Sequence, residues 1–184
     1  MADRSFQKQV WKIALPVALQ SMLQSSFSMV DQIMVGQLGE KSIAAVEIAG
    51  KPCFIYSFVI GAIGAIAGIM ISQYIGKQDR EQEEKSICIN FLVMLLTGLL
   101  FFLVSALFSY PFVSLFSEDD FVVREGSAYL RLIGWTCLPL GISNILGVVI
   151  RCRGKASYPL FVGMISAALN TVLNYCLIFG HLGA

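Results

Sequence analysis

Residues 52–75 read PCFIYSFVIGAIGAIAGIMISQYI and contain no charged side chain. A helix needs roughly 20 mostly apolar residues to cross the hydrocarbon core of a bilayer, where unpaired backbone groups are too costly for an irregular conformation. The segment therefore predicts a membrane-spanning helix. Within it, Gly64 and Gly68 have the spacing of small residues that lets a second helix approach closely.

The composition of the 184-residue chain agrees with a membrane protein. Hydrophobic residues make up 57%, charged residues make up 14%, and the mean hydropathy is +0.74. A soluble domain of this length could not bury so much apolar surface. Lys and Arg number 13 against 12 Asp and Glu, and this near-neutral balance gives no reason to expect a nucleic-acid partner.

Five segments qualify as spans, and we expect an all-α polytopic membrane protein with its N-terminus inside. With Lys12 at the start of the first span counted among the residues before it, Lys and Arg between the spans alternate along the chain as three, one, three, one, three and none, and such residues favour the cytoplasmic side. The first span follows a basic stretch, as in a signal peptide, but polar residues interrupt it and we interpret it as a membrane helix. The expected spans are approximately 11–35, 43–75, 86–109, 128–150 and 157–179.

The connection at residues 76–85, GKQDREQEEK, is rich in charge. Gly76 can end one helix, and Asp79 followed by Gln82 fits a capping pattern for the next. We therefore interpret this connection as a solvated cytoplasmic turn and not as a charged functional cluster.

The connection at residues 110–125 combines aromatic residues typical of the membrane interface with Ser117 and Asp120 at capping spacing. It predicts an amphipathic helix that lies on the outer face and leads into the fourth span. This connection and the one at residues 37–42 are expected outside the cell.

Two polar stripes interrupt the first and fifth spans. The stripe of the first span has residues spaced by four, four and three positions: Gln20, Gln24, Ser28 and Asp31. The stripe of the fifth span has residues spaced by four positions: Ser166, Asn170 and Asn174. Residues at these spacings share one face of a helix. Such faces avoid lipid, so we expect them to line a cavity or contact other helices.

The two stripes reach similar depths, because both spans run from inside to outside. At 1.5 Å per residue, Asp31 lies about 28 Å along its helix from Lys12, and Asn174 lies about 26 Å from Ser157. A carboxylate and the amide oxygens of Asn170 and Asn174 are hard ligands that suit a proton or a small cation such as Na+. The alternatives are hydrogen bonds between helices for the asparagines and a hydrated surface position for Asp31.

Pro16 and Pro139 lie inside predicted spans, where proline bends a helix. A fixed kink is the simpler interpretation of each, and a hinge for transport motion is the alternative. Both residues are therefore hinge candidates.

With these features in place, the chain resembles the N-terminal part of bacterial multidrug and toxic compound extrusion (MATE) transporters over essentially all of its length. The resemblance rests on the order and spacing of LPVALQ, VDQIMVGQLG, ISQYIGKQD, RCRGKASYPL and LNTVLNYCLIFG. It implies two six-helix lobes, and residues 1–184 would supply five helices of an incomplete N-terminal lobe. The sixth helix and the C-terminal lobe would be missing, so we expect this chain alone to be inactive.

The resemblance also implies a function. MATE transporters export cationic or amphipathic organic compounds through a central cavity, coupled to inward movement of H+ or Na+, here in the bacterial inner (cytoplasmic) membrane. In bacterial members an aspartate of the first helix and two polar residues of the fifth belong to the cation site, and they match Asp31, Asn170 and Asn174. No cofactor other than the coupling ion is expected.

Other functions compete with this one. A lipid-linked oligosaccharide flippase shares the superfamily architecture, but a large basic cavity would favour it, and the spans contain few cations beyond Lys51 and Arg131. A non-transporting membrane fragment or assembly partner is the alternative of a different class, and the polar stripes count against it. An enzyme is not expected, because His181 is the single histidine and no nucleophile is paired with a base.

Overall fold

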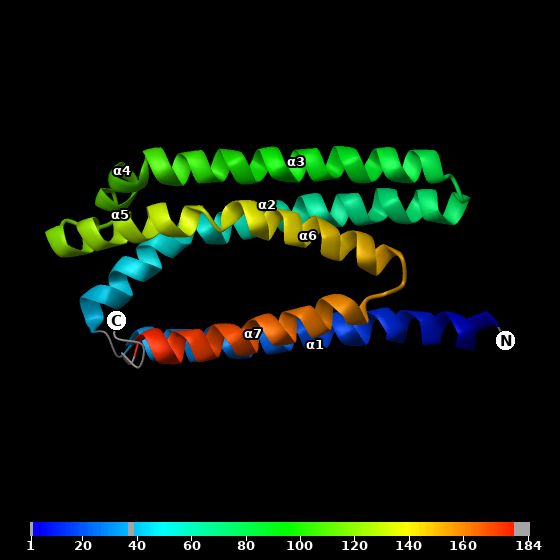
Figure 1. Cartoon of the computed structure of the whole chain (residues 1–184), viewed down its shortest axis with the longest axis horizontal. Coiled ribbons are helices and arrows are strands. Elements are labelled where there is room, and N and C mark those ends of the chain that lie inside the picture. Colours follow the sequence, from blue (N-terminus) through cyan, green and yellow to red (C-terminus); the bar gives the residue numbers. More distant parts are fainter. Residues whose placement is uncertain (1, 37–38, 179–184) are drawn as a thin grey trace. The chain divides into compact units, whose positions relative to one another are not determined.

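The computed structural model describes residues 2–36 and 39–178, and this part of the chain is helical without strands. Within these ranges the side chain of Asp31 is not described. The chain divides into two compact units, one built around the first and last helices and one from residues 39–149. The helices are α1 (Ala2–Gly36), α2 (Glu40–Lys77), α3 (Arg80–Leu107), α4 (Ser109–Ser114), α5 (Asp120–Gly134), α6 (Cys137–Cys152) and α7 (Ser157–Ile178) (Figure 1).

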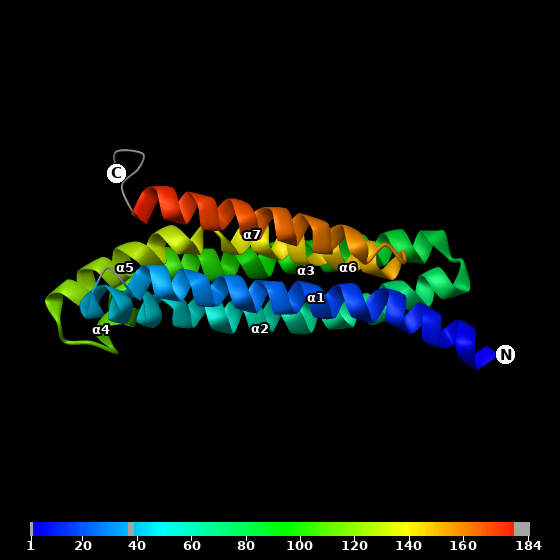
Figure 2. The ribbon, with the colours of Figure 1, turned by 90° about the horizontal axis from the view of Figure 1, so that it is seen from below.

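The first unit pairs α1 with α7. The two helices contact each other and run in the same direction (Figures 1 and 2), as expected for two spans that share an orientation. The structure assigns α1 as one helix through Pro16. Gly154 precedes α7 with a φ of +75°, a conformation that favours glycine, and its N–H donates to the Arg151 carbonyl at the end of α6.

In the second unit, α2 and α3 are joined by the short turn predicted at residues 76–85. Asp79 caps α3, because its carboxylate accepts a hydrogen bond of 3.1 Å from the backbone N–H of Gln82. This confirms the predicted cap. The end of α2 differs from the prediction: the helix continues through Gly76 to Lys77, and Gln78 takes the left-handed conformation with a φ of 58°.

The connection after α3 contains two helices in place of the single amphipathic helix predicted at 110–125. Short α4 is followed by an irregular segment, and α5 begins at Asp120. Asp119 caps α5 by accepting from the N–H groups of Phe121 at 2.9 Å and Val122 at 3.4 Å. The predicted capping pair was therefore wrong: Ser117 instead accepts from the N–H of Asp119, because a carboxylate one residue before the helix reaches the free N–H groups directly.

The fourth span, predicted as one helix over 128–150, is broken. α5 and α6 meet at an angle of 41° with Trp135 and Thr136 between them. The N–H groups of these two residues donate three positions back, to Leu132 and Ile133, which tightens the end of α5. Pro139 contributes to the break, because it has no N–H to donate to the carbonyl of Trp135.

Among the described residues, three single helices are long and apolar enough to cross a membrane, namely α2, α3 and α7. The bent pair of α5 and α6 meets the same requirement together. The side chains of α1 are described without a gap only over residues 14–30, so this comparison does not extend to α1. Helix composition thus supports a multi-pass membrane protein, while the count of five spans and the inside N-terminus stay predictions.

Small residues bring the helices of the second unit together. A Cβ placed on Gly64 of α2 would lie 2.6 Å from the Oδ1 atom of Asn144 of α6. One placed on Gly126 of α5 would lie 3.1 Å from Val113 of α4 and 3.3 Å from the carbonyl of Ala45. The predicted close approach at Gly64 is therefore confirmed. The buried core beside these contacts consists of Ala49, Val113, Val123 and Leu130.

Candidate functional site

The polar stripe of α1 meets α7 at Gln20. This side chain is half-buried, and a Cβ placed on Gly163 of α7 would lie 3.6 Å from its Nε2 atom and 3.7 Å from its Cγ atom. Gly163 has no side chain of its own, so the amide of Gln20 lies close to the backbone of α7. The stripe residue nearest the start of α1 is thus a contact residue between the two helices.

The two asparagines of α7 contact each other. The Nδ2 atom of Asn174 donates to the Oδ1 atom of Asn170 over 3.2 Å, as their spacing of one helical turn allows. Asn170 is exposed and Asn174 is half-buried. Each amide carries a carbonyl oxygen, which is the type of ligand that a small hard cation needs.

The other described stripe residues are exposed on this unit: Gln24, Ser28 and Ser166. By contrast, Ser21 and Ser26, which lie off the stripe, donate to carbonyls one turn earlier in α1. Serines of that kind satisfy their own hydroxyls within the helix. Exposed amides in a membrane helix need water or protein around them, so the stripes mark faces that require a polar environment.

Asp31 belongs to α1, three residues beyond Ser28, but its side chain lies outside the described residues. The structure therefore brings together Gln20 with α7 and Asn170 with Asn174. Contact of Asp31 with the asparagines stays a prediction. No three His, Cys, Asp or Glu side chains gather as a metal site within the described part of the chain.

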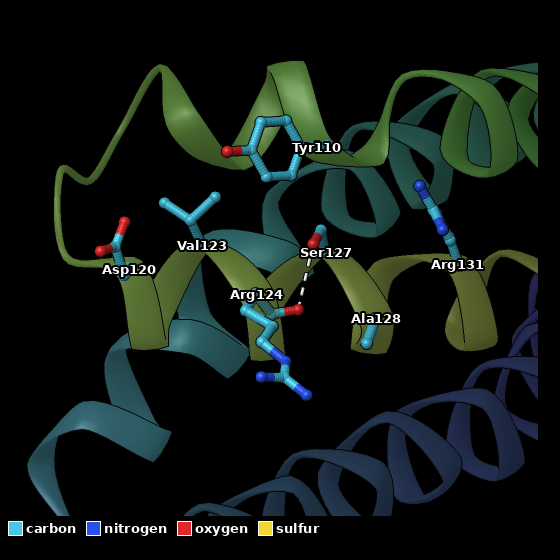
Figure 3. Close-up of a pocket in the computed structure, with 7 residues that line it drawn as sticks. All are labelled: Tyr110, Asp120, Val123, Arg124, Ser127, Ala128 and Arg131. Carbon is cyan, nitrogen blue, oxygen red and sulfur yellow. Dashed lines mark hydrogen bonds between the residues drawn. The ribbon is translucent and has the colours of Figure 1, made fainter.

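A hollow of about 490 Å³ lies beside α4 and α5 (Figure 3). The side chains of Arg124 and Arg131 point in different directions, and the Ser127 hydroxyl donates to the carbonyl of Arg124. The positive charges therefore do not converge on one point. None of the predicted site residues lines this hollow, whose walls are Tyr110, Asp120, Val123, Arg124, Ser127, Ala128 and Arg131.

The structure also contains buried polar contacts that the sequence reasoning missed. The hydroxyl of Tyr56 on α2 donates to the carbonyl of Cys137 on α6 over 2.5 Å. On α3, the Nδ2 atom of Asn90 donates to the carbonyl of Ser86 over 2.8 Å. The spacing of four between Ser86 and Asn90 is a signal that could have found the second contact. The first has no such signal, because its acceptor is a backbone group.

Comparison with known families and proteins gives a consistent answer. A family model described as MatE matches residues 16–176. A probable multidrug resistance protein NorM of Rhizobium meliloti is 28% identical over 93% of this chain and 36% of its own length. A probable multidrug resistance protein YpnP of Bacillus subtilis is 30% identical over 90% of this chain and 38% of its own length. The chain thus spans less than two fifths of the length of these two relatives.

Two solved structures share the fold. A MOP superfamily transporter from Pyrococcus furiosus superimposes with a TM-score of 0.85 at 21% identity, over 96% of this chain and 39% of its own. A multidrug resistance MATE family transporter in an outward-facing conformation gives a TM-score of 0.81, also at 21% identity, with the same two coverages. At this identity the likeness establishes a common arrangement of helices.

Proposed function

We propose that this chain, which belongs to the MatE family, forms part of a secondary transporter that exports cationic or amphipathic organic compounds. Export is coupled to inward movement of H+ or Na+ across the bacterial cytoplasmic membrane. The coupling ion binds at Asp31, Asn170 and Asn174. Gln20 and the exposed stripe residues line the cavity that the substrate enters.

The observation that carries this proposal is the pairing of α1 with α7. Two helices that a purely structural role in a membrane would make apolar present amides and hydroxyls, and the amides of Asn170 and Asn174 contact each other at 3.2 Å. Polar residues inside a membrane mark substrate or ion pathways. The family match over residues 16–176 and the names of the relatives support drug export as that function.

The coupling follows from the charge of one carboxylate. A low-dielectric environment disfavours the ionised form of Asp31, whereas a bound cation or nearby amide groups favour it. Loading a cation from outside neutralises Asp31 and changes the packing of α1, which lowers the affinity of the same lobe for a cationic substrate. Linkage of this kind between two sites typically amounts to about 1–3 kcal/mol, or roughly 5–150-fold in affinity.

The complete transport cycle needs more of a protein than residues 1–184. Alternating access requires two bodies that move against each other around one site, and the relatives are more than twice as long as the matched region. We therefore expect the 184-residue chain in liposomes to bind substrate and ion without catalysing ion-driven uptake of an organic cation.

Binding to the 184-residue chain in lipid nanodiscs tests the coupling site. The probe is rhodamine 6G, a fluorescent organic cation, titrated at several Na+ concentrations and pH values. We expect the affinity for the dye to fall as the Na+ or H+ concentration rises. The reason is that the dye binds the state with ionised Asp31, and a bound ion neutralises this carboxylate. In Asp31→Asn this dependence should disappear while the helical content stays unchanged.

The matched control is Glu84→Gln, which neutralises an exposed carboxylate near the start of α3. It should keep the wild-type dependence of dye affinity on both ions. A normal ion dependence in Asp31→Asn would show that Asp31 is not the coupling residue.

A further inference from the structure

Tyr56 is a buried polar residue of α2 that the proposed cation site does not use. Its side chain is fully buried, and its ring packs on Phe101 of α3 with centroids 5.0 Å apart. The hydroxyl extends past this contact to α6, where it donates to the carbonyl of Cys137 over 2.5 Å. One side chain thereby joins three helices of the second unit.

The hydroxyl of Tyr56 adds a second donor to a carbonyl in the first turn of α6. It donates to the carbonyl of Cys137, the first residue of α6. Within the helix this carbonyl faces the N–H of Gly141, four residues later. A side chain that hydrogen-bonds into this ladder is an established cause of helix bending.

Two glycines form the seat of the hydroxyl. A Cβ placed on Gly141 of α6 would lie 2.6 Å from the hydroxyl oxygen, and one placed on Gly98 of α3 would lie 3.2 Å from it. The first distance is shorter than van der Waals contact allows. Any side chain at Gly141 would therefore displace the hydroxyl from the turn.

The seat lies directly after the break between α5 and α6. Cys137 is the first residue of α6, and the two helices meet at 41°. Pro139, between Cys137 and Gly141 in this turn, weakens the local ladder because it has no N–H. On the other side of the break, Gly134 packs on Ser105 of α3, where a Cβ would lie 2.9 Å from the serine Cβ.

From this arrangement we propose that Tyr56 is a positioning residue, the latch of a hinge at the α5–α6 joint. The hydroxyl holds the first turn of α6 in its bent setting, and its release lets the angle between α5 and α6 change. The role of that motion in transport rests on the proposed function. A single hydrogen-bonded hydroxyl suits such a role, since one buried hydrogen bond is strong enough to bias a setting and weak enough to exchange.

Spin-label distances across the joint test the latch in the 184-residue chain in nanodiscs. The labels are placed at Glu125 on α5 and Leu146 on α6, both exposed, in a variant with the five native cysteines replaced by alanine. With Tyr56 present we expect one narrow distance distribution. Tyr56→Phe keeps the ring and removes the hydroxyl, so a second, shifted distance should appear. Tyr110→Phe, a matched change at an exposed tyrosine of α4, should leave the distribution unchanged.

A second variant tests the seat independently. Gly141→Ala should lower the midpoint of thermal unfolding when Tyr56 is present, because the new methyl group collides with the hydroxyl. In the Tyr56→Phe background the same substitution should cost much less, because the colliding atom is gone.

An unchanged distance in Tyr56→Phe, or equal costs of Gly141→Ala in both backgrounds, would overturn the proposal. Neither measurement involves substrate or ions, so failure of the latch would leave the proposed function standing. If Asp31→Asn kept a normal ion dependence, the proposed function would fail and the latch would still stand.

Discussion

The two units of the chain differ in where their uncharged polar side chains lie. Among the described residues of 39–149, several polar side chains are buried and bonded to the backbone, as Tyr56 is to Cys137 and Asn90 is to Ser86. In the unit of α1 and α7, the amides and hydroxyls of the stripes are exposed or half-buried. Buried hydrophobic residues follow the same division, because all but Ala156 of the described ones lie in residues 39–149.

This contrast separates structural from functional polarity. A buried polar group that is bonded to the backbone of its own unit stabilises one arrangement of the helices. A polar group that is exposed on a membrane helix is costly unless water, a partner or a ligand meets it. The second unit therefore resembles a scaffold, and the α1–α7 pair has the polarity expected of a working surface.

The prediction with the largest expected effect concerns the membrane topology of α1. The contrast assumes that α1 crosses the membrane. Single cysteines at Ser5 and Ser42, in a cysteine-free variant, should then lie on opposite sides of the membrane. A further single cysteine at Glu84 reports on the turn between α2 and α3. In intact cells an impermeant maleimide should label the cysteine at position 42 and spare those at positions 5 and 84. Labelling of positions 5 and 42 from the same side would remove α1 from the set of spans.

The next prediction compares packing in the two units. Gly64→Ala should destabilise the protein by about 1–3 kcal/mol, the usual cost of overpacking, because its methyl group would lie 2.6 Å from Asn144. Gly163→Ala should change stability by less than about 0.5 kcal/mol, because its nearest contact would be an ordinary 3.6 Å to Gln20. Reversible unfolding in mixed detergent micelles gives both values.

Gly61→Ala is the control, since no atom lies within 4 Å of a Cβ at that position. It should leave stability unchanged or raise it by up to about 1 kcal/mol through helix propensity. If Gly61→Ala and Gly64→Ala were equally destabilising, the loss would reflect the substitution of any glycine in α2, and the close approach of α6 would not be its cause. Asn144→Ala should in turn reduce the cost of Gly64→Ala, because it removes the atom that collides.

The sequence predicts these features unequally. The span at 157–179 agrees closely with α7, and the approach at Gly64 was expected, because hydropathy and small-residue spacing report them directly. The break at Trp135 was not predicted, because average hydropathy is the same for a straight and a bent span. The contact of Tyr56 was also not predicted, since a backbone carbonyl as acceptor has no sequence pattern.

A smaller effect on ion binding is expected from Asn174, which belongs to the unit of α1 and α7. Asn174→Ala removes the donor to Asn170 and one amide oxygen from the proposed cation site. A hydrogen bond between membrane residues is worth ~0.6 kcal/mol on average, so the ion dependence of rhodamine 6G binding should weaken by about threefold. Asn174→Asp is the informative partner, because an added carboxylate should strengthen the Na+ dependence. No change in either variant would place the asparagines outside the ion site.

The smallest effect is a pH dependence at the edge of the scaffold. The Nζ atom of Lys41 lies 2.7 Å from the Oδ2 atom of Asp119. This contact, together with the N–H groups of Val122 and Phe121, lowers the pKa of Asp119 below its ordinary value of 3.8. A carboxyl group whose pKa is lower in the folded state than in the unfolded state contributes stability above the unfolded pKa. That stability is lost as pH falls through the folded pKa.

We therefore expect wild-type stability to decline below about pH 4, the unfolded carboxyl pKa, in part because Asp119 becomes protonated. Asp119→Asn separates the two roles of this residue, because asparagine caps a helix as well as aspartate does but carries no charge. It should keep α5 intact, lower stability slightly at neutral pH, and flatten the acid decline. Asp119→Ala should lower stability further at every pH, because it also removes the cap. Unfolding midpoints at pH 3 to 7 compare the three proteins. An acid decline of the same depth in Asp119→Asn would assign it to other carboxyl groups, and the contact between Lys41 and Asp119 would then be a surface ion pair without measurable effect.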